Sequence, residues 1–369
     1  MTAAPLPPAG SAEELLARLA LCRTEGVGPV GFRRLLAREG SASAAIRALA
    51  RGPSVGVRVQ APPDMSAAER ELRAIERLGG VLLTLGDAAY PALLAQLQDA
   101  PPVLSVLGDP ALLAAPQIAI VGARAASAAG RRIAEDLAED LAEAGLAVTS
   151  GLARGIDAAA HLGALRVGRT LAVVPGGLDQ PYPRENAALQ ARIAERGAVV
   201  AEAPLGAAPL DRHFPRRNRV VAGLTLGVVV IEAALRSGTL ITAREAADLG
   251  RDVFAVPGHP LDPRSAGGNA LIKDGAPLVE RAADILDALP GLAGTAPAAL
   301  PQPPPRPSAT GGGADQLLEL IGQTPATVDD LVERCHLPFS EIQALLADLE
   351  LEGRVALLPG QRVVRTTSE

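Results

Sequence analysis

The chain has 369 residues, more than one hydrophobic core usually holds, so we expect two or three domains. Hydrophobic residues make up 48% and charged residues 21% of the sequence, which excludes a collagen-like or wholly disordered chain. The net charge of −6, taken alone, argues against a nucleic-acid partner.

The acidic excess is confined to the C-terminal end of the chain. Residues 315–369 hold 10 acidic and 4 basic residues, whereas residues 1–314 hold 31 of each. Of the 35 basic residues only Lys273 is a lysine. Arginine makes bidentate contacts to phosphate, although a GC-rich genome would enrich it as well. The charge of the whole chain is therefore the wrong quantity for excluding a nucleic-acid site in the first 314 residues.

The sequence shows no sign of export, membrane insertion or metal binding. Cys22 and Cys335 cannot supply a four-cysteine metal site or a disulfide framework, and the four histidines lack ligand spacing, so we expect no metal and no cofactor. The N-terminus has no basic region followed by an apolar run, and the longest apolar stretch, residues 220–235, contains Glu232. We therefore expect a cytoplasmic protein without membrane contact.

Residues 1–60 form the first predicted domain. Apolar residues at helical spacing on both sides of TEGVGPVG (residues 24–31) predict two helices joined by a glycine-rich turn. This is the order of a helix-hairpin-helix or SAM-like domain, whose hairpin amides can meet a DNA phosphate. A plain pair of packed helices explains the pattern equally well, and both interpretations stay open.

Residues 65–289 form the second predicted domain, in which short apolar runs alternate with amphipathic helices such as Ala128–Ala144 and Arg184–Arg196. This alternation predicts an α/β fold with a doubly wound, mainly parallel sheet. The expected strands are Val81–Leu85, Val103–Leu107, Gln117–Val121, Ala147–Thr149, Thr170–Val174, Ala198–Ala201, Gly227–Ile231 and Asp252–Val256.

Residues 290–314 are almost uncharged and dense in Pro, Gly and Ala, which is typical of a linker. In residues 315–369 three predicted helices precede a predicted β-hairpin that turns at Pro359-Gly360, which is the order of a winged-helix domain. The segment of its third helix, SEIQALLADLELEG (residues 340–353), carries four acidic residues and no base, so we expect a protein-contact or regulatory role rather than DNA reading. The helices and the hairpin are Asp315–Ile321, Thr327–Arg334, Ser340–Leu351 and residues 352–366.

Common catalytic motifs are missing from the α/β domain. The sole lysine is followed by Asp274, which excludes a P-loop, no G-x-G-x-x-G follows a strand, and no G-x-S-x-G elbow is present. What remains is a set of strand-to-helix turns rich in Gly, Ser and Arg. In a doubly wound sheet such turns gather at the carboxyl edge, where ligands bind. The turns lie in residues 118–127, 149–161, 173–186, 213–223 and 232–243.

Arginines in these turns indicate an anion site. Glycine lets the backbone approach a ligand, free helix N-terminal amides attract anions, and arginine adds charge and bidentate geometry. We expect the arginines to face one pocket that has no evident nucleophile or general base and suits several phosphates better than one. They are Arg124, Arg154, Arg184, Arg212, Arg216, Arg217 and Arg219.

Each of these residues also has a purely structural interpretation. Gly122 and Gly151 can serve as tight turns, Asp157 as a helix N-terminal charge or an arginine partner, and His161 as a buried, hydrogen-bonded histidine. Base stacking would depend on very few rings, because the whole chain has six aromatic residues.

Six ordered segments resemble the DNA-processing protein A family (DprA, also called Smf). The resemblance is strong over residues 80–289 and looser in the flanking domains. The segments are VGARAAS (121–127), SGLARGIDAAAH (150–161), PGGLDQPYPREN (175–186), FPRRNRVVAGLT (214–225), SGTLITAREA (237–246) and VFAVPGHPLDPRSAGGNALIKDGA (253–276).

The resemblance implies an extended Rossmann-like domain that binds single-stranded DNA without sequence preference and without enzymatic activity. It further implies that the protein protects incoming strands in natural transformation and hands them to the RecA recombinase. A position where some family members have lysine is Asp211 here, with Arg212 beside it. The candidate DNA-binding residues are Gly122, Arg124, Ser127, Ser150, Gly151, Arg154, Gly155, Asp157, Arg184, Arg212, Arg217, Asn218, Arg219, Ser237 and Gly238.

Two further expectations come from similarity to known proteins. The segment around Asn269, Ile272 and Leu278 resembles the family's dimer-forming edge, with the RecA surface close by, so we expect a homodimer with two DNA grooves. The alternative function is a nucleotide-binding phosphoribohydrolase, because residues 174–177 (VPGG) are similar to the phosphate loop of those enzymes. That loop continues to Gly-Thr and a glutamate, whereas here Leu178-Asp179-Gln180 follows.

Overall fold

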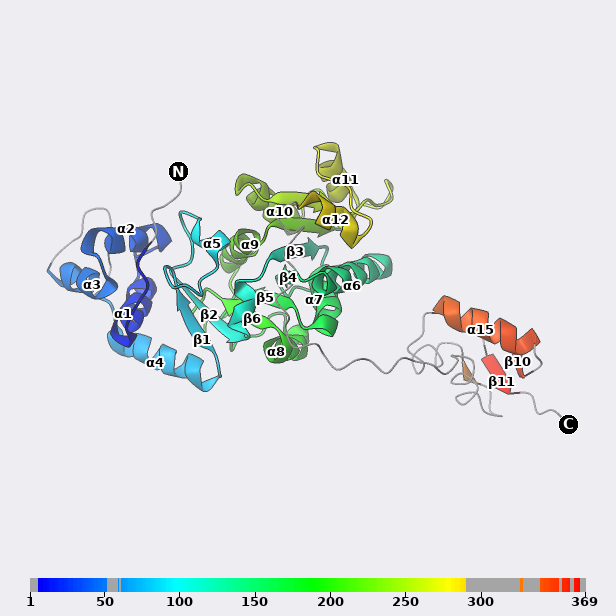
Figure 1. Cartoon of the computed structure of the whole chain (residues 1–369), viewed down its shortest axis with the longest axis horizontal. Coiled ribbons are helices and arrows are strands. Elements are labelled where there is room, and N and C mark those ends of the chain that lie inside the picture. Colours follow the sequence, from blue (N-terminus) through cyan, green and yellow to red (C-terminus); the bar gives the residue numbers. More distant parts are fainter. Residues whose placement is uncertain are drawn as a thin grey trace. The chain divides into compact units, whose positions relative to one another are not determined.

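The computed structural model describes residues 6–51, 59, 61–289, 326–327, 339–351, 354–358 and 362–365. The chain divides into two compact units, Met1–Leu300 and Pro301–Glu369, whose secondary structure is shown in Figure 1. The predicted linker at residues 290–314, the predicted helix Asp315–Ile321 and Cys335 lie outside the described residues. None of the helices in the described part is long and apolar enough to cross a membrane.

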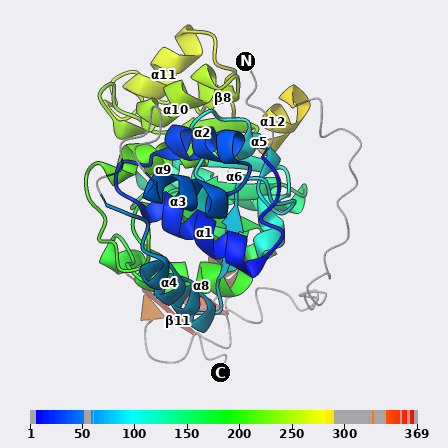
Figure 2. The ribbon, with the colours of Figure 1, turned by 90° about the vertical axis from the view of Figure 1, so that its left-hand side faces the viewer.

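The first unit opens with a helical module, which faces the viewer in Figure 2. The side chains of Ser11 and Ser41 cap the first and third helices by accepting hydrogen bonds from backbone amides. The two helices predicted around the glycine-rich turn are present, and the third completes a small core around Phe32 and Leu35. The fourth packs against the first through Ala68. The helices are α1 (Ala12–Arg23), α2 (Pro29–Glu39), α3 (Ala42–Ala50) and α4 (Met65–Arg77).

An eight-stranded sheet with the order β1-β2-β6-β5-β4-β3-β7-β8 follows. Strands β3 to β8 run parallel, and β2 is antiparallel to both of its neighbours. All eight predicted strands are confirmed to within one residue at each end. The strands are β1 (Val81–Thr84), β2 (Val103–Gly108), β3 (Gln117–Gly122), β4 (Ala147–Ser150), β5 (Thr170–Val174), β6 (Ala198–Ala201), β7 (Gly227–Ile231) and β8 (Asp252–Ala255).

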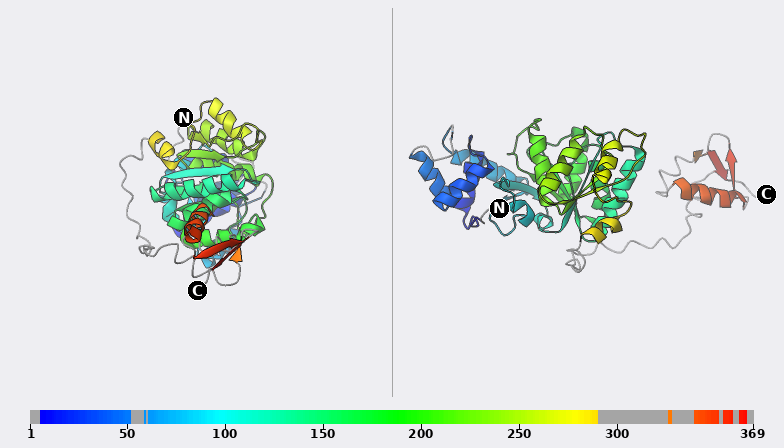
Figure 3. Two further views of the ribbon diagram at one scale, coloured as in Figure 1. Left: turned by 90° about the vertical axis from the view of Figure 1, so that its right-hand side faces the viewer. Right: turned by 90° about the horizontal axis from the view of Figure 1, so that it is seen from above.

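Helices cover both faces of this sheet (Figure 3). Side chains alternate along a strand, so Ala119 and Val121 pack beneath α5, α9 and α10, whereas Ile118 and Ile120 pack against α6, α7 and α12. The segment predicted as one helix over 184–196 begins with a short 3₁₀ turn. The helical elements are α5 (Ala92–Ala95), η1 (Pro110–Leu113), α6 (Ala128–Glu143), α7 (Ile156–Val167), η2 (Arg184–Asn186), α8 (Ala187–Arg196), α9 (His213–Leu224), α10 (Gly238–Asp248), α11 (Ala266–Lys273) and α12 (Ala282–Ala288).

The order of the sheet determines where a ligand can bind. Strand β3 lies between β4 and β7, so the chain winds outward from β3 in two directions. The loops that follow β3 and β7 therefore leave in opposite directions and open a crevice at the carboxyl edge. This confirms the predicted doubly wound, mainly parallel architecture and places the glycine- and arginine-rich turns at that edge.

The second unit contains a three-stranded sheet with the order β10-β11-β9, and one described helix. The predicted helix at Ser340–Leu351 and the predicted hairpin are confirmed. Thr327, expected to begin a helix, instead lies opposite Arg362 in a strand that widens the hairpin, and residues 328–334 and 359–360 lie outside the described residues. The elements are β9 (Ala326–Thr327), α15 (Phe339–Leu351), β10 (Val355–Leu358) and β11 (Arg362–Arg365).

Candidate nucleic-acid interface

A buried arginine on α9 lies at the centre of the carboxyl edge. Arg217 is 8% exposed, and its Nε and Nη1 atoms have no hydrogen-bond partner among the described residues. The nearest carboxylate oxygen, Oδ2 of Asp157, is 3.9 Å from Nη1. Burial lowers the pKa of Arg217, because desolvation disfavours the charged guanidinium. A buried cation with unused donors is costly, so an anionic ligand would stabilise this arrangement.

The loop after β4 packs against this guanidinium. A Cβ atom on Gly151 would lie 1.2 Å from Nη1 of Arg217, so the guanidinium rests directly on the loop backbone. Oδ2 of Asp157 accepts hydrogen bonds from the amides of Gly151 (3.2 Å) and Ala153 (3.3 Å). Burial raises the pKa of Asp157, while Arg217 and the two amides oppose the rise. Asp157 therefore serves to hold the loop and partner the arginine.

Two arginines and two aromatic rings line a cavity of about 260 Å³ beside Arg217. Cζ of exposed Arg124 lies 5.6 Å from the ring centroid of Phe214, and Tyr182 meets the same ring edge-on at 5.5 Å. Arg154 also lines this cavity, with its Nε 2.5 Å from a carboxylate oxygen of Glu185. Aromatic faces beside arginines suit a nucleobase next to its phosphate.

A second cavity of about 610 Å³ lies over the crevice and shares Arg124, Gly151 and Arg217 with the first, so the two form one groove. We call it the Arg217 groove. The N-terminus of α10 opens into it, where the Ser237 side chain accepts a hydrogen bond from the amide of Thr239. The predicted site residues that line this second cavity are Gly122, Arg124, Gly151, Asp157, Arg217, Asn218, Ser237 and Gly238.

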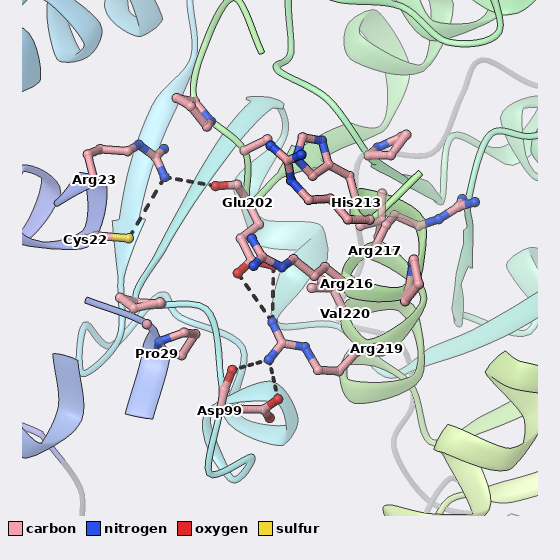
Figure 4. A pocket seen from close by; sticks show the side chains of 18 of the residues that line it. Cys22, Arg23, Pro29, Asp99, Glu202, His213, Arg216, Arg217, Arg219 and Val220 are labelled. Carbon is pink, nitrogen blue, oxygen red and sulfur yellow. Dashed lines mark hydrogen bonds and ion pairs between the residues drawn. The ribbon is translucent and has the colours of Figure 1, made fainter. Parts of the chain in front are cut away.

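The predicted arginines do not all face one pocket, which corrects that expectation. Arg212, Arg216 and Arg219 line a third cavity, of about 990 Å³, between α9 and the glycine-rich turn of the helical module (Figure 4). Arg219 is already bonded there, to Asp99 at 2.5 Å and to Glu202 at 3.2 Å. Arg217 lines this cavity as well as the Arg217 groove, whereas Arg219 lines only this one of the three cavities.

The remaining candidates are placed differently again. Arg184 is exposed in η2 and lines none of the three cavities. The hydroxyl of Ser150 donates to the carbonyl of Ile120 at 2.6 Å, and the hydroxyl of Ser127 accepts from the amide of Gly130 at 2.8 Å, so both are engaged inside the protein.

Glycine is required at position 155 by the close approach of two loops. Its φ is +72°, and a Cβ atom there would lie 2.2 Å from the carbonyl oxygen of Ala123. Gly155 therefore joins the loops after β3 and β4 and does not itself need to touch a ligand.

His161 is fully buried, with Nδ1 2.7 Å from the hydroxyl oxygen of Thr170. Burial, with a smaller contribution from the charge of Arg217, lowers the pKa of His161 to about 3. The imidazole is therefore neutral at physiological pH and belongs to the protein interior. This agrees with the structural interpretation of the sequence.

The three residues of the predicted dimer edge lie beyond β8. The side-chain amide of Asn269 bonds both the amide (3.2 Å) and the carbonyl (2.9 Å) of Gly258, so it shapes its own loop. Ile272 is half-buried, and Leu278 is 46% exposed beside Ala255 of β8. One exposed and one half-buried aliphatic residue do not establish a dimer interface, so the homodimer stays a prediction.

Sequence reasoning missed several residues of the site. Thr239 donates from its hydroxyl to the carbonyl of Gly122 at 3.0 Å and thereby ties α10 to the end of β3. Asp99 and Glu202 neutralise Arg219 from distant segments, and no local pattern announces that pairing. Arg264, which also lines the Arg217 groove, pairs with Asp262 at 2.8 Å.

The family follows from comparison with known proteins. Residues 81–290 match the family model described as DNA recombination-mediator protein A. The chain belongs to this family. The flanking parts match the DprA-like N-terminal HHH domain (residues 12–74) and the DprA winged helix domain (residues 301–361). The resemblance inferred from the six segments is therefore confirmed.

Individual DprA and Smf proteins agree with this membership. The chain is 42% identical over 301 residues to Protein Smf of Escherichia coli, covering 79% of each chain. It is 47% identical over 201 residues to the DNA processing protein DprA of Streptococcus pneumoniae, covering 54% of this chain and 71% of that protein.

Two solved structures of DprA proteins share the fold. The X-ray structure of DprA from Streptococcus pneumoniae matches with a TM-score of 0.58 and 38% identity, over 67% of this chain and 82% of that one. A DprA structure from Helicobacter pylori matches with a TM-score of 0.51 and 29% identity, over 57% of this chain and 96% of that one. The latter is described as revealing a single-stranded DNA binding mode.

Proposed function

We propose that this chain binds single-stranded DNA without sequence preference, along the Arg217 groove. The observation that carries the proposal is the buried guanidinium of Arg217 at the carboxyl edge of the sheet, whose Nε and Nη1 have no hydrogen-bond partner among the described residues. A backbone phosphate at this edge would neutralise the guanidinium and accept charge-assisted hydrogen bonds from it, because arginine is well suited to phosphate oxygens.

The other residues of the groove suit a polymer of nucleotides. Arg124 adds an exposed charge beside the Phe214 ring, and the N-terminus of α10 adds a partial positive charge. Rings that stack on bases do so whatever the base, so we expect no sequence preference. The Helicobacter pylori relative described by its single-stranded DNA binding mode supports the same ligand for this chain.

We propose no chemical step for this site. Asp157 is occupied by two amides and by Arg217, and His161 is buried and neutral, so neither is arranged as a general base for a bound strand. Binding and transfer of the strand are then the whole activity.

Membership of the family supports a proposal for the biological role. We propose that the protein protects incoming single strands in the cytoplasm and loads RecA in natural transformation and recombination, which the family description as a recombination mediator supports. A homodimer formed near Asn269, Ile272 and Leu278 would join two grooves and raise avidity. The proposed domains are residues 1–60, 65–289 and 315–369, with a linker at 290–314.

Fluorescence anisotropy with labelled oligo(dT) and a matched duplex, across salt concentrations, tests the binding proposal. Affinity for the single strand should fall steeply with salt, with a slope of about −0.7 per phosphate contact. Equal affinity for both oligonucleotides, or salt-independent binding, would contradict the proposal. RecA filament formation on coated single strands is the second readout, and no acceleration by this protein would refute the loading role.

A further inference from the structure

A carboxylate of the chain itself occupies the N-terminus of α6. Glu232 directly follows β7, and its Oε2 accepts a hydrogen bond from the amide of Ser127 at 2.8 Å. Its Oε1 accepts the hydroxyl proton of the same serine. Ser127 is the residue that caps α6, so the Glu232 carboxylate lies over the positive end of that helix.

The backbone and a neighbouring glycine both accommodate this carboxylate. Glu232 has a φ of +50°, a left-handed conformation that is strained for a glutamate. A Cβ atom on Gly130, in the first turn of α6, would lie 2.6 Å from Cδ of Glu232. A larger residue at position 130 would therefore displace the carboxylate. Strain that is retained at a ligand-binding edge indicates a function there rather than an accident of packing.

The N-terminus of α6 is the place where a doubly wound sheet ordinarily receives a phosphate. The helix after the strand at the topological switch point offers its free amides to the phosphate of a bound nucleotide. Strand β3 is that strand here, and α6 is the helix that follows it. In this chain an internal anion already takes the position.

We propose that Glu232 is a specificity-determining residue. Its carboxylate occupies the phosphate-binding position at the N-terminus of α6 and so prevents free nucleotides from binding there. The DNA backbone then binds along the Arg217 groove. The inference rests on the proposed function for the polymer that is retained. A terminal phosphate carries up to two charges and three free oxygens and needs several converging donors, which helix amides provide. A phosphodiester has one charge and two free oxygens, which one arginine can satisfy.

Replacement of the glutamate by glycine tests the inference. Glu232→Gly removes the carboxylate and also suits the left-handed backbone, so the fold should be retained. The probe is dAMP, with deoxyadenosine as the ligand that lacks phosphate, measured by isothermal titration calorimetry. We expect Glu232→Gly to bind dAMP at least about tenfold more tightly than wild type, with no gain for deoxyadenosine.

Two controls accompany this variant. Glu232→Gln keeps an oxygen that can accept a hydrogen bond from the Ser127 amide, so this variant should bind dAMP no more tightly than the wild type does. Glu143→Gly removes the same charge at the exposed C-terminal end of the same helix and should not change dAMP affinity. A folded Glu232→Gly that binds dAMP no better than wild type would overturn the inference.

A measurement on the wild-type protein tests whether Glu232 blocks the N-terminus of α6, even if the glycine variant does not fold. The amide resonances of Ser127 and Gly130 should not shift when inorganic phosphate is added, because the Glu232 carboxylate already occupies the N-terminus of α6. Saturable shifts of those two resonances would refute the inference. Neither result depends on oligo(dT) binding, so a failure of the proposed DNA-binding function would be seen separately.

Discussion

Gly151 and Arg217 are in direct contact across the carboxyl edge: a Cβ atom on Gly151 would lie 1.2 Å from Nη1 of the arginine. The loop after β4 and the helix α9 are more than sixty positions apart in sequence, yet the absence of one side chain lets the guanidinium lie flat on the loop. The glycine thus does more than make a tight turn. It provides the space in which the central cation of the groove is held.

Gly151→Ala should impair DNA binding much more than folding. The added methyl group displaces the far end of a flexible side chain, so the guanidinium moves and the backbone need not. We expect a loss in oligo(dT) affinity of at least about tenfold, as for one charge-assisted bidentate contact. Anisotropy titrations and thermal unfolding measure the two effects.

Gly28→Ala is the matched control. Gly28 also lies in a turn, outside the Arg217 groove, and none of the described residues has an atom within 4 Å of an added Cβ, so this variant should bind oligo(dT) as the wild type does. Equal losses for the two variants, or unchanged binding by Gly151→Ala, would show that Arg217 is not the central phosphate contact.

Arg124→Ala and Arg219→Ala should separate binding from stability. Exposed Arg124 is in none of the ion pairs found in the described residues, so its loss should leave stability unchanged and reduce the salt slope of oligo(dT) binding by about 0.7. Arg219 has a side chain that is 16% exposed and pairs with Asp99 and Glu202. Its loss should lower the free energy of unfolding by about 2 kcal/mol, because two partly buried carboxylates lose their partner.

Chemical denaturation and salt titrations on both variants check this separation. If Arg219→Ala keeps full stability but loses DNA affinity, Arg219 contacts the strand and the assignment of its role to packing is wrong.

The sequence predicted the sheet well because each strand has its own local signal. Apolar runs such as Thr170–Val174 and Gly227–Ile231 stand between helices, and the structure places both to the residue. The site was harder to predict. Arg217 and Arg219 look equivalent in the segment FPRRNR. Only the orientation of α9 separates a guanidinium that has unbonded donor atoms and one distant carboxylate from a guanidinium held by two carboxylates.

Other features of the site have no sequence signal at all. The left-handed backbone of Glu232 and its bond to Ser127, more than a hundred positions away, arise from the ends of β7 and β3 lying side by side. A glutamate that follows a strand in the sequence predicts neither the left-handed backbone nor the hydrogen bond to Ser127. Long-range charge pairing and backbone strain therefore had to come from the structure.

Phe214→Leu should weaken binding to all single strands to a similar degree. The Phe214 ring lies beneath Arg124 and beside Tyr182, at the mouth of the smaller cavity, and leucine keeps the apolar volume but offers no face for stacking. We expect a loss of about 1–3 kcal/mol in binding free energy, the usual range for one stacked base. Titrations with dT, dC and dA oligonucleotides of equal length measure it, and a loss confined to one base would instead indicate base-specific contacts.

His161 should make the protein less stable as the pH falls below about 6.5. In the folded chain burial lowers the pKa of His161 to about 3, whereas the unfolded imidazole titrates near 6.5. Between these two pH values the unfolded state binds a proton that the folded state does not bind. The free energy of unfolding is therefore highest above pH 6.5 and declines as the pH falls towards 3. Between pH 6.5 and 4.5 the free energy of unfolding should drop by about 2.5 kcal/mol from this residue alone.

His161→Gln retains a polar partner for Thr170 but does not titrate. The difference in free energy of unfolding between wild type and variant should therefore narrow by that amount on acidification. Urea denaturation at several pH values measures both curves, and parallel curves would mean that His161 is protonated in the folded protein.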